Sequence, residues 1–141
     1  MITSTIGYLA LGATVAAALL FGGSARAAEL DLGAAVPDVT VLDQDGQEVS
    51  LAKAAGAGFT LVYFYPKADT PGCTKQACSL RDAYADLTKL GVTVYGVSAD
   101  TVAAQKAFKD KFKLPFQLLA DADGKVIAAF GVPKVLGFAK R

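Results

Sequence analysis

The sequence contains no histidine, and this absence removes several kinds of active site. Ser-His and Cys-His nucleophile pairs, histidine-rich zinc sites and the most common general base all require an imidazole. Cysteine is scarce as well, because the chain has only Cys73 and Cys78. Two thiols cannot complete a four-ligand zinc site unless carboxylates or a second chain contribute. We therefore expect no metal and no chemistry that depends on imidazole.

A large excess of either charge is also missing, since 14 basic residues stand against 13 acidic ones without a long run of either sign. The charge pattern therefore argues against nucleic-acid binding and against an acidic tail. Apolar residues are abundant: they make up 53% of the 141 residues, enough for one domain with one core. Small neutral or weakly charged partners are favoured.

The first residues have the features of a targeting segment. Ile6 to Phe21 is an almost uninterrupted apolar run, shorter than the ~20 residues that cross a bilayer as a helix. Ala25-Arg26-Ala27 follows with the small-x-small form of a signal-peptidase site. The pattern predicts a signal peptide at residues 1–27, export, and a mature domain at residues 28–141. Because Met1 to Thr5 carry no Lys or Arg, a retained membrane anchor remains the alternative.

Beyond Gly33, short apolar segments alternate with helical patterns. Asp45-Gly46 separates two alternating apolar stretches, which predicts a hairpin. A flexible segment is expected at residues 54–58. Residues 59–65, FTLVYFY, lack polar alternation, which is typical of a central strand covered on both faces. We also expect strands at residues 92–98 and 116–121, a helix from Thr101 to Phe112 capped by Asp100, and a short helix at 126–130 after an Asp123-Gly124 turn.

The segment after Pro71-Gly72 changes to a helical period. Its apolar residues recur at steps of four, three, four and three, and they are Cys73, Ala77, Leu80, Tyr84 and Leu87. Strands that alternate with helices predict an α/β fold whose mostly parallel central sheet is flanked by helices. Sites in such sheets lie beyond the carboxyl ends of the strands. Here the loop from Pro66 to Gly72 brings Cys73 to the start of a helix.

The spacing of Cys73 and Cys78 argues against a permanent disulfide. Five residues along an α-helix separate the two Cα atoms by roughly 8.5 to 9 Å. A disulfide requires less than about 7 Å, so the bond could close only if the first turn of the helix unwound. A redox pair that changes conformation fits this geometry better, because local unfolding can bring the sulfurs together. Two inert buried thiols remain the alternative.

Cys73 is expected to be the nucleophile of the pair. A thiol at a helix N-terminus meets unpaired N–H groups and the positive end of the helix dipole, which favour the thiolate. Thr70 precedes it by three residues and has a hydroxyl that can hold a substrate or stabilise developing charge. Capping of the helix is an alternative role for Thr70. Pro66 and Pro71 would stiffen the loop and shield the sulfur.

The segment FYPKADTPGCTKQACSLRD, residues 64–82, resembles the active-site signature of the peroxiredoxins, P-x-x-x-T-x-x-C. The C-x-x-x-x-C continuation resembles the Q-type branch, the bacterioferritin comigratory proteins, and the resemblance extends from about Gly33 to Arg141. It implies a thioredoxin-like fold and thiol-dependent reduction of hydrogen peroxide and organic hydroperoxides. It also implies thioredoxin or a similar dithiol as reductant, no metal or organic cofactor, and a monomer or weak dimer.

The resemblance assigns a role to each candidate site residue. Cys73 resembles the peroxidatic cysteine, Cys78 the resolving cysteine, and Thr70 and Pro66 their pocket. Arg141 matches an arginine that the family places near the peroxidatic sulfur. Arg81 lies more than two turns along the helix, so we expect an exposed ion pair there instead.

Two further expectations follow from the family pattern. Family members continue beyond this arginine with strands and a closing helix, so the domain is expected to be truncated, with one edge of the 59–65 strand left unpaired. Two rival functions use the same cysteines: a peroxide sensor that passes its oxidation to a partner protein, and a thioredoxin-type disulfide oxidoreductase. The latter normally requires C-x-x-C, so the four intervening residues argue against it.

Overall fold

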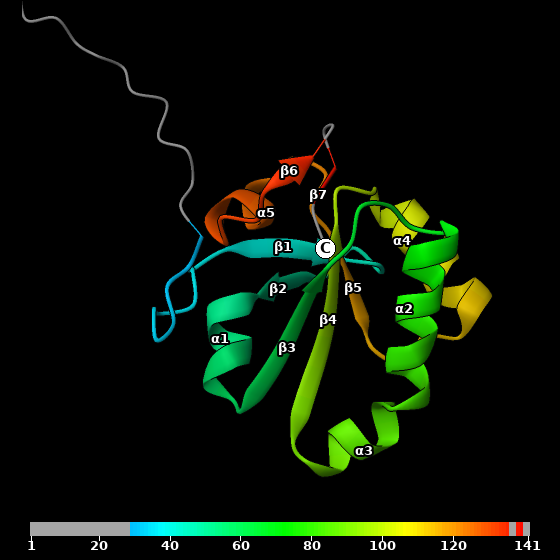
Figure 1. Ribbon diagram of the computed structural model, residues 1–141, viewed down its shortest axis with the longest axis horizontal. Coiled ribbons are helices and arrows are strands. Elements are labelled where there is room, and N and C mark those ends of the chain that lie inside the picture. The colour runs from blue at the N-terminus through cyan, green and yellow to red at the C-terminus, as the bar shows by residue number, and fades with distance from the viewer. Residues whose placement is uncertain (1–28, 136–137, 140–141) are drawn as a thin grey trace, which may run out of the picture.

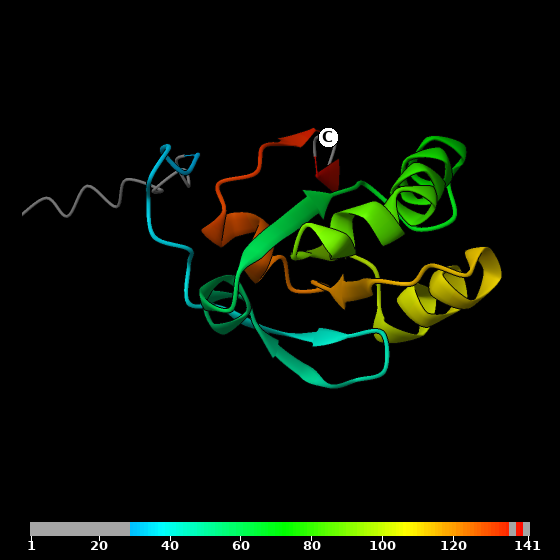
Figure 2. The same ribbon diagram turned by 90° about the horizontal axis from the view of Figure 1, so that it is seen from below.

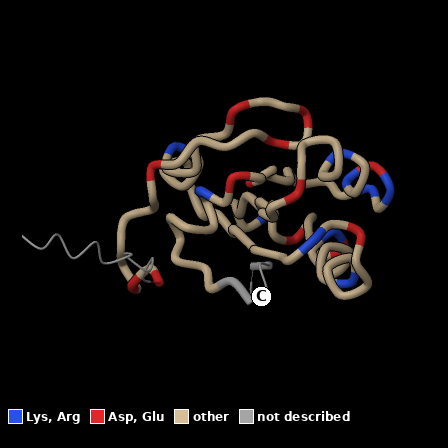
Figure 3. Tube along the Cα trace, turned by 90° about the horizontal axis from the view of Figure 1, so that it is seen from above, with Lys and Arg blue, Asp and Glu red and all other residues tan. Residues whose placement is uncertain are grey.

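The computed structural model describes residues 29–135 and 138–139. The predicted signal at residues 1–27 and Arg141 lie outside this part of the chain. Within it, no helix has both the length and the apolar character needed to span a bilayer. Acidic and basic residues are interspersed along the described chain (Figure 3).

A mixed five-stranded sheet forms the centre of the fold, in the order β2-β1-β5-β4-β3. Its strands are β1 (Thr40–Asp43), β2 (Glu48–Ser50), β3 (Phe59–Phe64), β4 (Val92–Ser98) and β5 (Gln117–Ala120). Strands β3, β4 and β5 are parallel, and the β1–β2 hairpin joins β5 through an antiparallel pairing. The parallel strands were expected; the hairpin makes the whole sheet mixed.

Helices cover both faces of this sheet (Figures 1 and 2). Side chains of α2 (Pro71–Asp82), α3 (Tyr84–Lys89) and α4 (Val102–Phe112) pack into the core of one face. Side chains of α1 (Leu51–Gly56) and α5 (Lys125–Ala129) pack into the core of the other face. A separate two-stranded sheet of β6 (Lys134–Val135) and β7 (Phe138–Ala139) follows α5.

The period of two along the strands divides the side chains between the two cores. Tyr63 and Val94 lie in the core beneath α2, whereas Tyr95 and Val97 lie in the core beneath α5. The apolar stripe predicted for the helical segment is also confirmed. Its five residues, Cys73, Ala77, Leu80, Tyr84 and Leu87, all pack in or against the first core.

Two local predictions are wrong because side chains supply helix caps that the sequence pattern did not reveal. The segment expected to be flexible belongs largely to α1, whose first turn Ser50 caps by accepting from the Lys53 amide. Helix α4 is capped by Thr101, whose hydroxyl accepts from the Ala104 amide. Asp100, expected to be that cap, instead accepts hydrogen bonds from Ala68 and Ser98.

Strand β3 is an edge strand of the described sheet: the central position predicted from its composition is not observed, whereas one unpaired edge was expected from the family pattern. It pairs only with β4. Two apolar side chains in its first half are exposed to solvent. Phe59 is 79% exposed and Leu61 is 37% exposed. An apolar run shows that a strand can be covered on both faces, but it does not determine where the strand stands in the sheet.

Candidate active site

The loop between β3 and α2 carries most of the predicted site residues. It leaves the sheet at Tyr65, whose amide donates to the Val97 carbonyl at 3.0 Å, and continues through the half-buried Pro66. The Ala68 amide donates to Asp100 Oδ2 at 2.7 Å. Asp69 then adopts a left-handed conformation with φ 55°, which reverses the chain just before α2. Pro66 and Thr70 thereby lie in the loop at the carboxyl end of β3, and Cys73 follows in the first turn of α2.

Cys73 is the third residue of α2 and is 1% exposed. Its side chain lies in a core cluster that includes Tyr63, Tyr65 and Ala77. Pro71 occupies the first helical turn and has no amide hydrogen. The amides of Gly72 and Cys73 have no acceptor in a preceding helical turn, so the positive end of the helix lies at the sulfur.

Thr70 is the N-cap residue of α2 by position, but its side chain does not cap the helix. Its hydroxyl donates to the Lys67 carbonyl at 3.1 Å, and the Thr70 carbonyl accepts the first helical hydrogen bond from Thr74. Of the two roles left open by the sequence, side-chain capping is therefore excluded. Because the hydroxyl hydrogen is already engaged, its oxygen is left to act as an acceptor.

Cys78 lies five residues further along α2 and is half-buried. Neither cysteine is in a disulfide in the described chain. Arg81 forms the predicted ion pair, with Nη2 2.9 Å from Asp82 Oδ1, and Asp82 raises the pKa of this guanidinium. Arg81 Nη1 also donates to the Phe112 carbonyl at 3.0 Å, which ties the second half of α2 to the end of α4.

Two tyrosines beside Cys73 were not identified from the sequence. Burial is the main cause that raises the pKa of both Tyr63 and Tyr65, and the charge of Cys73 contributes to both shifts. Both hydroxyls are therefore neutral hydrogen-bonding groups. The sequence could have placed both tyrosines on one face of the strand, the face of Cys73, because residues two apart in a strand share a face.

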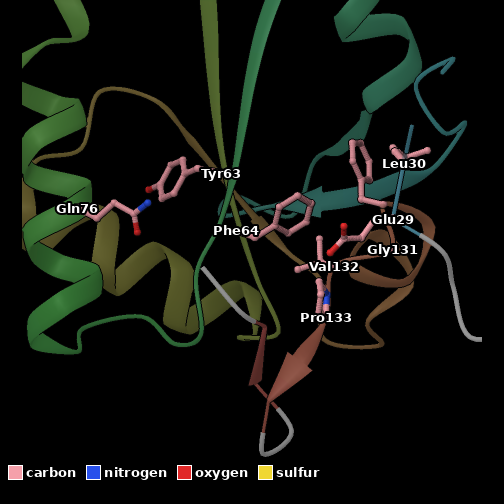
Figure 4. Close-up of a pocket in the computed structure, with 9 residues that line it drawn as sticks. Glu29, Leu30, Tyr63, Phe64, Gln76, Gly131, Val132 and Pro133 are labelled. Carbon is pink, nitrogen blue, oxygen red and sulfur yellow. The ribbon is translucent and has the colours of Figure 1, made fainter. Parts of the chain in front are cut away.

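A cavity of about 540 Å³ lies beside the end of β3. Tyr63 Oη and Gln76 Oε1 are buried without a hydrogen-bond partner among the described residues. Figure 4 shows their side chains pointing toward each other on the α2 side of β3. The other residues that line the cavity are mostly apolar: Glu29, Leu30, Phe64, Phe130, Gly131, Val132 and Pro133. Gln76 follows Cys73 by three residues, so helical spacing could have placed it near the site.

The described side chains form no candidate metal centre. Among the described residues, no group of three or more Cys, Asp or Glu side chains could hold a metal ion. The predicted site residues divide into three groups: Pro66, Thr70 and Cys73 lie in the loop after β3 and the first turn of α2, Cys78 lies further along the same helix, and Arg141 is outside the described residues.

The α/β fold, with a buried cysteine in the first turn of the helix that follows β3, is a thioredoxin-like arrangement shared with solved peroxiredoxin structures. Comparison with known proteins agrees with this class, since residues 32–141 match the AhpC/TSA family. The chain belongs to this family, and its relatives place it in the Q-type peroxiredoxin branch. The resemblance of residues 64–82 and the predicted thioredoxin-like fold are thereby confirmed.

Among the relatives is the chloroplastic peroxiredoxin Q of Oryza sativa subsp. japonica. It is 52% identical over 101 residues, which make up 72% of this chain and 46% of the rice protein. The chain thus spans about half the length of the curated relatives it matches.

Two solved structures have the same fold. Peroxidoxin BcpB from Mycobacterium tuberculosis gives a TM-score of 0.69 at 37% identity, covering 76% of this chain and 70% of that one. The bacterioferritin comigratory protein of Xanthomonas campestris, described for its alkyl peroxide reduction activity, gives 0.68 at 28% identity, covering 82% and 73%.

Proposed function

We propose that this protein is a thiol-dependent peroxidase that reduces hydrogen peroxide and organic hydroperoxides through Cys73. The observation that carries the proposal is the position of Cys73, buried in the first turn of α2, three residues after Thr70, whose hydroxyl is not used as a cap. Family membership supports the same chemistry. The neutral tyrosines around the sulfur would exclude water from the reaction.

In the first step, the Cys73 thiolate attacks one peroxide oxygen, so that an S–O bond forms while the O–O bond breaks. The released oxygen takes a proton and leaves as water or an alcohol, and Cys73 becomes a sulfenic acid. Thr70 Oγ1 would accept the O–H hydrogen of the peroxide and orient it for in-line attack, since its own hydrogen is held by Lys67. Pro66 would form one wall of the pocket. Arg141 is proposed to stabilise charge on the leaving oxygen.

In the second step, the Cys78 thiol condenses with the sulfenic acid to form a disulfide, and water leaves. The two cysteines lie on different sides of an ordered helix, so the first turn of α2 must open before they can meet. The contact between Arg81 and the Phe112 carbonyl would hold the second half of α2 in place during this opening. A dithiol such as thioredoxin then reduces the disulfide.

We further propose that the protein acts outside the cytoplasm as a monomer or weak dimer. The apolar run from Ile6 to Phe21 and the Ala25-Arg26-Ala27 site support a signal peptide at residues 1–27. Expression of the full chain tests this part, because cleavage would give a protein that starts at Ala28. A protein with an intact Met1 in the membrane fraction would instead support the membrane anchor.

Peroxide consumption with dithiothreitol tests the main proposal. Wild type and Cys73→Ser should be compared with hydrogen peroxide and with an alkyl hydroperoxide, and with insulin as a disulfide substrate. We expect turnover of both peroxides by wild type, none by Cys73→Ser, and no insulin reduction. Peroxide turnover that persists in Cys73→Ser would contradict the proposal. Insulin reduction without peroxide turnover would support a disulfide oxidoreductase instead.

A further inference from the structure

A buried hydrogen-bond network meets the active-site loop at Asp100. A single oxygen of this residue, Oδ2, accepts from the Ala68 amide at 2.7 Å and from the Ser98 hydroxyl at 2.7 Å. Asp100 follows β4 and directly precedes Thr101, the cap of α4. The carboxylate therefore joins the loop before α2 to the carboxyl end of a strand in the middle of the sheet.

The network continues into the core through Gln105. Its Nε2 donates to Ser98 Oγ at 2.9 Å and to the Leu119 carbonyl at 2.8 Å, and its Oε1 accepts from the Tyr65 hydroxyl. Ser98 and Gln105 are fully buried and Tyr65 is 1% exposed. A buried network in which every member is satisfied is rigid, because each group has a single favourable arrangement. The Asp100 carboxylate is thus held in place by α4, β4 and β5.

The loop depends on this anchor. From Pro66 to Thr70, the other described side-chain link to the rest of the fold is an exposed ion pair between Asp69 and Lys111, with Nζ 2.7 Å from Oδ2. Exposed pairs of this kind contribute little to order. Ala68 itself packs against the core cluster that contains Cys73. A shift of the Ala68 backbone would therefore move Thr70 relative to the sulfur.

We propose that Asp100 is a positioning residue of the peroxide site: by holding the Ala68 amide, it fixes the loop that sets Thr70 against Cys73. This role rests on the proposed peroxidase function. Displacing a positioned group by about 1 Å can lower a rate ~100-fold, so loss of the anchor should slow peroxide reduction strongly. Since one oxygen accepts both hydrogen bonds, this role requires an acceptor oxygen at the position of Oδ2 and does not require a negative charge.

Substitutions that separate geometry from charge test this role. In Asp100→Asn the carbonyl oxygen can still accept both hydrogen bonds, whereas in Asp100→Glu the charge remains but the oxygen is displaced by one methylene. Asp100→Ala removes both. Asp69→Asn is the matched control, because it makes the same chemical change in the same loop and Asn tolerates the left-handed conformation.

Two rates should be measured on each reduced variant: oxidation of Cys73 by peroxide and its alkylation by iodoacetamide. Alkylation requires an accessible thiolate but not the peroxide pocket. We expect peroxide oxidation to fall about 10- to 100-fold in Asp100→Ala and Asp100→Glu, and to stay within about 3-fold of wild type in Asp100→Asn and Asp69→Asn. Alkylation should change less than about 3-fold throughout.

Three results would overturn the positioning role while leaving the peroxidase intact. They are wild-type peroxide rates in Asp100→Ala and Asp100→Glu, an equal loss in Asp100→Asn, and a parallel loss of alkylation and peroxide oxidation. If Asp100→Ala does not fold, the contrast between Asp100→Asn and Asp100→Glu decides. Failure of wild type itself to consume peroxide would overturn both the function and this role.

Discussion

Gly96 of β4 lies directly opposite Tyr63 of β3, and the Tyr63 ring lies over it. A Cβ atom at Gly96 would stand 2.7 Å from the Tyr63 hydroxyl oxygen and 2.8 Å from Leu118 Cδ2. Both distances are far below van der Waals contact, so this position has room only for glycine. The Tyr63 ring, which lies in the same core cluster as Cys73, can occupy this position because Gly96 on the neighbouring strand has no side chain.

The substitution Gly96→Ala should therefore destabilise the fold. Overpacking of a core typically costs about 1 to 3 kcal/mol, and here the added methyl group would press on a buried ring. Urea unfolding of the purified domain should show this loss in the free energy of unfolding. Gly56→Ala is a suitable control, because nothing lies within 4 Å of that position at the end of α1. An equal stability of the two variants would contradict the packing argument.

A substitution at Lys113 is expected to stabilise the fold. Lys113 is the C-cap of α4 and adopts a left-handed conformation with φ 54° and ψ 45°, which is unfavourable for a residue with a Cβ atom. Lys113→Gly should raise the free energy of unfolding by about 0.5 to 1 kcal/mol. Lys113→Ala keeps the Cβ atom and should leave it nearly unchanged. A thermal or urea transition that moves equally in both variants would show that backbone conformation is not the cause.

The elements that the sequence predicts well are those determined by local patterns. Asp45-Gly46 turns the chain between two alternating segments, and the observed register pairs Val41 with Val49. The helical stripe that begins at Cys73 is visible because α2 and α3 bury one face against a single core. The same locality explains why Pro66, Thr70 and Cys73 could be assigned together, since they lie within one loop and one turn.

Contacts between distant residues could not be read in the same way. Ala68 and Asp100 are 32 residues apart, and no periodicity connects a backbone amide to a carboxylate at that distance. Asp100 was expected to cap α4, which is its most local use. The position of β3 in the sheet could not be predicted for the same reason, because strand order depends on which strands pair and not on the composition of one strand.

Thr70 allows catalysis and stability to be separated. Thr70→Val keeps the shape of the side chain but removes the oxygen, so peroxide oxidation of Cys73 should fall by about 100-fold, a loss expected when the substrate is no longer held in position. The hydroxyl makes no capping hydrogen bond, so the free energy of unfolding should change by less than the ~1 kcal/mol that loss of a cap costs. Thr70→Ser should retain most of the activity. Stopped-flow oxidation and urea unfolding measure the two quantities.

A large loss of stability in Thr70→Val with normal peroxide oxidation would reverse this assignment and return Thr70 to a capping role.

Cys78 determines the fate of the oxidised Cys73 in the proposed mechanism. In wild type, one equivalent of peroxide should give a disulfide, detected as the loss of two hydrogens in the intact mass. In Cys78→Ser no second thiol remains in the chain, so the sulfenic acid should persist and, with excess peroxide, gain one and then two further oxygens at Cys73. The first oxidation should proceed at nearly the wild-type rate, because Cys78 lies outside the Cys73 core cluster.

Ser79→Ala is the matched control for this experiment, since it changes the neighbouring exposed residue of α2 without removing a sulfur. It should form the disulfide as wild type does. If Cys78→Ser instead resists overoxidation and turns over with dithiothreitol as fast as wild type even at high peroxide, the second cysteine has no resolving role. The opening of α2 would then be unnecessary for the cycle, because an external thiol would reduce Cys73 directly while the helix stays intact.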